Sequence, residues 1–182
     1  MTLLILGLLL WMAAHLFKRL APEARGAMGE KGKGPVALGI LAGLVLMVVG
    51  FRMTQTADLY PLPSFFRNIN NTLMVIAVIL FGVGQSKSRL RGKMRHPMLT
   101  GVVVWGVAHL LVNSDAASLV LFGGMILWAL AEMTLINRTE PAPERYKDGS
   151  LKGDIRLVLI GLVVFAVIAG IHTWLGYYPF PG

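Results

Sequence analysis

Six apolar stretches separated by short polar segments form the main pattern along the chain. They cover residues 2–17, 36–53, 68–85, 98–112, 116–136 and 155–174. Each stretch is close to the ~20 residues that an α-helix needs to cross a bilayer. The pattern therefore predicts an all-α fold: an integral membrane bundle of six transmembrane helices, in a single domain that covers residues 1–182.

Composition and charge support this interpretation and give the bundle an orientation. Hydrophobic residues make up 55% of the chain, charged residues 14%, and the mean hydropathy is +0.68. Fifteen of the 17 Lys and Arg residues lie in alternate connecting segments, 18–35, 87–95 and 138–156. Under the positive-inside rule these segments are cytoplasmic and both termini are periplasmic in a bacterial inner membrane. The net charge of +8 is therefore a topology signal, and no nucleic-acid partner is expected.

Two details refine the predicted helices. No Lys or Arg precedes the first apolar stretch and Lys18 and Arg19 follow it, which is the reverse of a secretory signal and indicates a permanent helix. Gly39 and Gly43 in the second stretch form a small-xxx-small face, which favours close approach of a neighbouring helix.

The first and fourth stretches share a glycine, a tryptophan and a histidine at four-residue spacing. These are Gly7, Trp11 and His15 in one copy and Gly101, Trp105 and His109 in the other. Such spacing places each trio on one helix face. Because segments 1–86 and 87–182 each hold three predicted helices of opposite orientation, the pattern is typical of a 3+3 inverted repeat. A chance match within membrane-like sequence is the alternative.

The four histidines are the main candidates for chemistry. They are His15, His96, His109 and His172. Histidine inside a membrane helix is costly, faces the bundle interior and is a functional candidate. The chain has no cysteine, so imidazoles are the available metal ligands, and imidazole suits haem iron. Trp11 and Trp105, with the small residues beside them, would make room for a flat macrocycle. An interhelical hydrogen bond is the alternative role of any single histidine.

The depth of each histidine can be worked out from the helical rise of ~1.5 Å per residue. His15 is predicted to lie roughly 4–5 Å inside the cytoplasmic face, and His109 and His172 about 6 Å inside the outer face. This depth favours pairing His109 with His172, and His15 with His96. His96 stands at the interface beside basic residues, where binding of lipid headgroups or helix capping is the alternative to ligation.

Polar residues at the helix ends have two interpretations. Asn113 continues the stripe of His109, and Asp115 follows closely, so either could orient a ligand histidine by a hydrogen bond. Helix capping by the same side chains is the alternative. Glu132 shares a face with Trp128, and we expect it to snorkel or to pair with a basic residue of a loop.

Residues 95–99 (Arg-His-Pro-Met-Leu) and 105–123, which run from Trp105 through His109 to Gly123, closely resemble the NnrU family of bacterial membrane proteins. His15, the Gly-Glu-Lys run at 29–31 and His172 extend the resemblance over essentially the whole chain. The family is associated with denitrification, in nitrite and nitric oxide metabolism. It is also similar to the plant 15-cis-zeta-carotene isomerase, a membrane protein that uses histidine-ligated haem b. The resemblance implies haem b here, with His15 and His109 as ligands of the iron. The depth argument instead favours His172 as the alternative partner of His109.

Three function classes follow. The first is a haem-containing membrane protein with redox or isomerase chemistry on a small or lipophilic substrate. A thiolate-exchange step in such chemistry is excluded because the chain has no cysteine. The second is a non-enzymatic accessory or nitric-oxide-sensing protein that works beside denitrification membrane proteins. The third is an enzyme that resembles isoprenylcysteine carboxyl methyltransferases, suggested by Arg95-His96-Pro97 with Gly101, although the paired glutamates expected downstream are missing.

Overall fold

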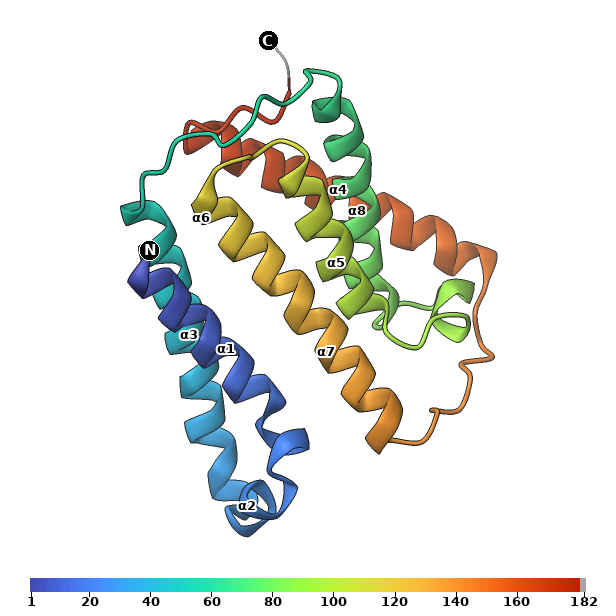
Figure 1. The fold of residues 1–182 in the computed structure, drawn as a ribbon. Helices are drawn as coiled ribbons and strands as arrows, with labels where there is room; N and C mark the ends of the chain where they lie inside the picture. Colours follow the sequence, from blue (N-terminus) through green and yellow to red (C-terminus); the bar gives the residue numbers. More distant parts are fainter. Residues whose placement is uncertain (181–182) are drawn as a thin grey trace. The chain divides into compact units, whose positions relative to one another are not determined.

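A computed structural model describes residues 1–180 of the chain (Figure 1). The fold is all-α, as the apolar pattern predicts, and residues 1–180 contain no β-strand. The helices are α1 (Thr2–Leu20), α2 (Pro22–Ala27), the 3-10 turn η1 (Gly29–Gly32), α3 (Lys33–Met53), α4 (Phe66–Val83), the 3-10 turn η2 (Arg89–Gly92), α5 (Pro97–Leu110), α6 (Ala116–Ser118), the π-helical turn η3 (Leu119–Gly123), α7 (Gly124–Thr139) and α8 (Leu151–Trp174).

Five of these helices are long and apolar enough to cross a membrane. They are α1, η1 with α3, α4, the continuous helix from α6 to α7, and α8. The fourth predicted helix differs, because α5 has only 14 residues. At ~1.5 Å per residue it is about 21 Å long, shorter than a hydrocarbon core of ~30 Å. Pro97 begins this helix and the chain turns after Leu110, so the predicted residues 111–112 are not helical. The chain is a multi-pass membrane protein.

The segment between the first two spanning helices is more ordered than the predicted polar loop. Residues 22–32 form α2 and η1, and α3 already begins at Lys33. Helix α1 runs three residues beyond the predicted end at Phe17 and includes Lys18 and Arg19 in its last turn. Basic side chains are favourable there because they lie at the negative end of the helix dipole.

The contacts divide the chain into two compact units that interleave along the sequence. Unit 1 consists of Met1–Pro61 and Asn113–Glu140, and unit 2 consists of Leu62–Val112 and the chain from Pro141 onward. Unit 1 therefore holds α1, α3 and α7, and unit 2 holds α4, α5 and α8. These units are not the sequence halves 1–86 and 87–182, so the inverted repeat stays a prediction.

Glycines bring α1 and α3 of unit 1 into close backbone contact, and the two helices run in opposite directions (Figure 1). A Cβ atom at Gly43 would lie 2.8 Å from the backbone N of Trp11, and one at Gly7 would lie 2.8 Å from the carbonyl O of Gly43. Gly50 meets the backbone of Leu4 in the same way. The predicted small-residue face is thus used at Gly43, whereas Gly39 has room for a Cβ.

A network of hydrogen bonds joins the 54–61 segment of unit 1 to the start of α6. Asp115 is the N-cap of α6 and accepts a hydrogen bond from the backbone N–H of Ser118 at 3.0 Å. Its carboxylate also accepts from the hydroxyls of Ser118, at 2.5 Å, and Thr56, at 2.9 Å. The Ser114 hydroxyl donates to Asp58 at 3.1 Å. The helix-capping interpretation of this region is therefore confirmed for Asp115.

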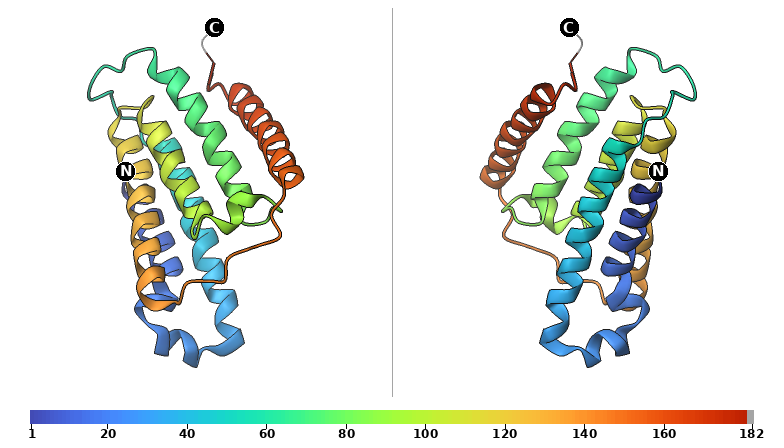
Figure 2. Two further views of the ribbon diagram at one scale, coloured as in Figure 1. Left: turned by 90° about the vertical axis from the view of Figure 1, so that its right-hand side faces the viewer. Right: turned by 90° about the vertical axis from the view of Figure 1, so that its left-hand side faces the viewer.

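In unit 2, α4 packs against both α5 and α8, and α8 runs alongside α4 in the opposite direction (Figure 2). A small core of Leu80, Val83 and Leu157 holds α4 to α8. Two glycines allow the neighbouring helices to pack closely against α4. A Cβ at Gly101 on α5 would lie 3.1 Å from the Phe81 ring on α4, and a Cβ at Gly161 on α8 would lie 2.8 Å from an Ile79 side-chain carbon.

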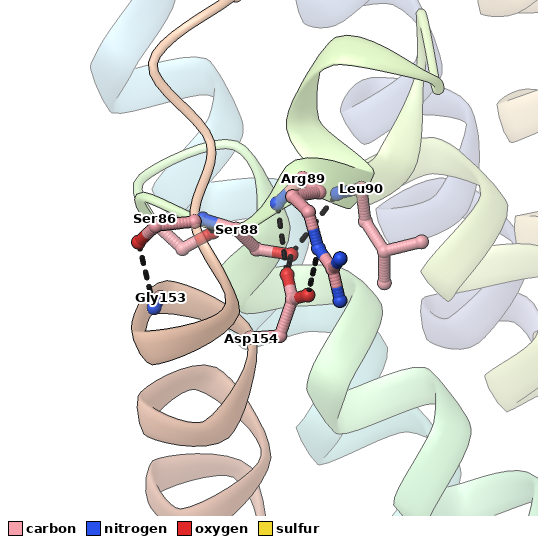
Figure 3. Close-up of polar contacts among 7 residues, drawn as sticks. Ser86, Ser88, Arg89, Leu90, Gly153 and Asp154 are labelled. Carbon is pink, nitrogen blue, oxygen red and sulfur yellow. Dashed lines mark hydrogen bonds and ion pairs between the residues drawn. The ribbon is translucent and has the colours of Figure 1, made fainter.

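The basic 86–96 segment is clasped to the start of α8 by hydrogen bonds (Figure 3). Asp154 accepts from the Ser88 hydroxyl at 2.7 Å and from the backbone N–H of Arg89 at 2.8 Å, and it pairs with the Arg89 side chain at 2.5 Å. Ser88 is fully buried. Gly153 allows the contact, because a Cβ there would collide with the carbonyl group of Lys87.

Candidate functional site

The three histidines within apolar helices share one local geometry. In each, Nδ1 lies within hydrogen-bond distance of the carbonyl O four residues earlier, at 3.0 Å for His15, 2.9 Å for His109 and 2.8 Å for His172. A carbonyl can only accept, so these bonds require Nδ1 to carry the proton. The lone pair then resides on Nε2, which is the arrangement that a neutral imidazole needs to ligate a metal.

Unit 2 contains a cavity of about 410 Å³ between α4, α5 and α8. Its walls are almost wholly apolar, with residues such as Met74, Phe81 and Val164. Trp105 and His109 enter it from α5, and His172 enters it from α8. The volume falls within the range of ~300–1,000 Å³ that is usual for ligand pockets, which are lined by apolar side chains with a few polar groups.

His109 and His172 are therefore the two histidines that this cavity brings together. They come from different helices and from distant parts of the sequence, and the Trp105 ring lies 5.1 Å from the His109 ring, centre to centre. The predicted depths of the two histidines, about equal from the outer face, agree with this placement. The arrangement offers two imidazoles and a large aromatic ring in an otherwise apolar chamber.

Asn70 supports the part of α5 that carries His109. Asn70 is a buried polar residue of α4, only 8% exposed. With its amide oriented to satisfy its neighbours, its nitrogen donates to the carbonyl O of Ala108 at 2.9 Å. Ala108 directly precedes His109, so this bond fixes the last turn of α5 to α4.

His15 lies in unit 1, in a cluster of three rings. Its ring centre lies 4.2 Å from that of Trp11 on the same helix and 4.8 Å from that of Trp128 on α7. The two indoles meet edge to face at 5.5 Å. The structure thus places the two histidines of the resemblance, His15 and His109, in different units.

The NnrU protein family matches residues 3–179, nearly the whole chain. The chain belongs to the NnrU family. Comparison with curated proteins and with solved structures found no significant match. Membership is consistent with a membrane protein linked to denitrification.

The remaining predicted site residues of this NnrU protein lie at helix ends. His96 occupies the N-cap position of α5, where its carbonyl accepts a hydrogen bond from the Thr100 hydroxyl at 2.8 Å. Asn113 and Asp115 belong to unit 1, in the turn before α6. The bonds of Asp115 to Ser118 and Thr56 serve the cap, so its proposed action on a ligand histidine stays a prediction.

Sequence reasoning missed Arg19 and the residues of α4 that line the cavity. Arg19 extends the stripe of Trp11 and His15 by one more four-residue step, and it pairs with Glu132 at 2.5 Å. That spacing was a usable signal, and the expected pairing of Glu132 with a basic residue is confirmed. The cavity wall on α4 carries no such signal, because an apolar residue that faces a cavity and one that faces lipid look alike in sequence.

Among residues 1–180, no group of three or more His, Cys, Asp or Glu side chains gathers as a metal site. A closed metal centre made of protein ligands alone needs about four such groups. Haem iron takes four of its ligands from the macrocycle and needs only one or two from the protein. The pair in the unit 2 cavity of this NnrU protein fits that smaller requirement.

Proposed function

We propose that this NnrU protein binds haem b in the unit 2 cavity, where His109 and His172 would hold the iron. The observation that carries the proposal is the shared cavity, into which the two histidines enter from α5 and α8. Both have Nδ1 bonded to a backbone carbonyl, which orients the ring and puts the lone pair on Nε2, as a ligand of iron requires. This pair replaces the pair of His15 and His109 that the resemblance implied.

The chain would supply an apolar chamber and an oriented pair of imidazoles. Bound haem would supply one-electron redox chemistry. The walls of the cavity are almost wholly apolar, and Trp105 offers a ring that would pack against the bound group. Asn70 holds the turn that carries His109, so that the ring keeps its orientation. This chemistry suits a role in nitrite and nitric oxide metabolism.

Absorption spectroscopy of the purified protein tests the proposal. We expect a Soret band after expression with haem supplementation, and its loss or shift in His109→Ala and in His172→Ala. His15→Ala and His96→Ala are matched controls, since both remove an imidazole outside the cavity, and they should keep the band. A protein that stays colourless overturns haem binding. A band lost in His15→Ala but kept in His172→Ala overturns the ligand pair in favour of the pair from the resemblance.

We further propose that the protein lies in the bacterial inner membrane with the basic segments in the cytoplasm. The absence of native cysteine makes the test direct, because one introduced thiol is the only one to label. Ser64→Cys, in the segment before α4, should react with a membrane-impermeant maleimide in intact spheroplasts. Asp148→Cys, in the basic segment before α8, should react only after the membrane is opened. The opposite pattern would reverse the orientation.

A further inference from the structure

A second polar site lies within unit 1, between α1 and α7. Trp11, His15 and Arg19 follow one another at four-residue steps on α1, and Trp128 and Glu132 do so on α7. The π-helical turn η3 directly precedes α7, and such turns within α-helices often mark functional sites. The ring of Trp128 contacts the rings of Trp11 and His15. One helical turn further along each helix, Arg19 forms an ion pair with Glu132.

Four polar atoms of this site are buried and have no hydrogen-bond partner among residues 1–180. They are the indole nitrogens of Trp11 and Trp128, the Nε of Arg19 and the Oε2 of Glu132. Three are donors and one is an acceptor, and the Glu132 side chain is only 8% exposed. In a membrane helix each such group is costly, so a small molecule that both donates and accepts would satisfy the set.

The site opens stepwise toward the end of α1 that carries the 18–35 segment. The exposed fraction of the side chain rises from 8% for Glu132 to 15% for Arg19, 43% for Glu140 and 73% for Lys18. The same residues are linked by ion pairs, with Arg19 to Glu140 at 3.4 Å and Lys18 to Glu140 at 3.9 Å. A charged chain therefore runs from the buried carboxylate to the surface.

We infer that the cluster of Trp11, Arg19, Trp128 and Glu132 is a hydrated proton-binding site. Bound water satisfies the three free donors and Oε2, and Glu132 exchanges a proton with the end of the helix that Lys18 reaches. Membrane-embedded carboxyl groups beside a basic partner are typical of proton relays. The inference is independent of haem binding, which concerns unit 2.

The proposed step moves one proton and no electrons. A hydronium ion at the Lys18 end gives its proton to Oε2 and becomes water, the carboxylate becomes a carboxylic acid, and Arg19 keeps its charge. The charged and titratable groups around Glu132 are Arg19, Lys18 and His15 on α1 and Glu140, the residue directly after α7.

Infrared difference spectroscopy of the full-length protein in lipid nanodiscs tests the proton. Between alkaline and acidic buffer we expect a carboxylic acid C=O band that shifts in D₂O. The band should be lost in Glu132→Gln and kept in Glu140→Gln, the matched control at the exposed end of the chain. A band that survives Glu132→Gln, or no such band in the wild type, overturns the proposal.

Glu132→Gln removes the nearer of the two carboxylates that pair with Arg19, so this variant can fail to fold. The double variant Arg19→Gln with Glu132→Gln removes both charges and should also lose the band. Hydration is measured on the wild type by solvent exchange of ¹⁵N-labelled indole N–H groups. We expect those of Trp11 and Trp128 to exchange with D₂O faster than the backbone N–H groups beside them in α1 and α7. Equally slow exchange of indole and backbone groups overturns the hydrated site.

Discussion

Close contact between α1 and α3 makes Gly43 the most sensitive small residue of unit 1. A Cβ atom there would lie 2.8 Å from the backbone N of Trp11, 3.1 Å from its Cα and 3.0 Å from the carbonyl O of Gly7. Comfortable contacts between such atoms are about 3.5–4.0 Å. Because all three are backbone atoms, no side-chain rotation relieves the clash, and the two helices must move apart by roughly half an ångström to an ångström.

The cost of Gly43→Ala follows from this displacement. Overpacking of a well-packed contact costs about 1–3 kcal/mol, and separating the helices also weakens the neighbouring contacts. Alanine recovers about 1 kcal/mol of helix propensity. Gly170→Ala on α8 is the matched control, because a Cβ there meets nothing within 4 Å and only the propensity gain remains. Because both variants share the propensity gain, we expect them to differ in free energy of unfolding by the overpacking cost of about 1–3 kcal/mol.

Equilibrium unfolding in mixed micelles with increasing SDS, followed by circular dichroism, measures this difference. Gly43→Ala should unfold at a lower SDS fraction than the wild type, whereas Gly170→Ala should unfold at the same fraction or a higher one. If Gly43→Ala proves as stable as Gly170→Ala, the backbone contact between α1 and α3 does not exist as described.

Two further predictions concern polar contacts at the helix ends. Partial burial by itself raises the pKa of the Asp115 carboxyl, but hydrogen bonds from Ser118 and Thr56 outweigh it and hold that pKa below its usual value. The stabilisation is therefore present above pH ~4 and is lost as pH falls through the lowered pKa. A carboxylate accepts these hydrogen bonds more strongly than an amide oxygen does, so the stability advantage of wild type over Asp115→Asn, about 1 kcal/mol, should shrink in acid. Gly153→Ala would place a Cβ against the Lys87 carbonyl and so weaken the contact between the 86–96 segment and the start of α8. Limited proteolysis should then cut the 141–150 segment faster than in the wild type, and an unchanged rate would contradict this contact.

The sequence alone predicted the membrane-spanning helices and the all-α class, because the length of an apolar stretch and the charge of the connections are properties of whole segments. Its errors lie at boundaries that depend on single contacts. The end of α5 at Leu110 is set by the turn that leads to Asp115, and α1 continues to Leu20, where Arg19 meets Glu132. The residues concerned, Asp115 and Glu132, lie in other segments of the chain, so neither boundary can be predicted from its own segment.

Pairing across helices was predictable only where two residues share a depth. The rise per residue placed His109 and His172 at a similar depth, and the structure puts both on one cavity. Depth says nothing about which helices are neighbours. The sequence therefore did not predict that α7 belongs to the same unit as α1 and α3. For the same reason it did not predict the ring contact between Trp11 and Trp128.

The two candidate sites suit different ligands, because the side chains that line them differ in polarity. The unit 2 cavity is apolar and holds the imidazoles of His109 and His172, which favours a large flat group with a metal that accepts nitrogen. The unit 1 cluster has an ion pair and buried polar atoms without partners among residues 1–180, which favours water and a proton. An electron-transferring group in one unit and a proton-binding carboxyl in the other, Glu132, would give the chain both particles that the reduction of a nitrogen oxide consumes.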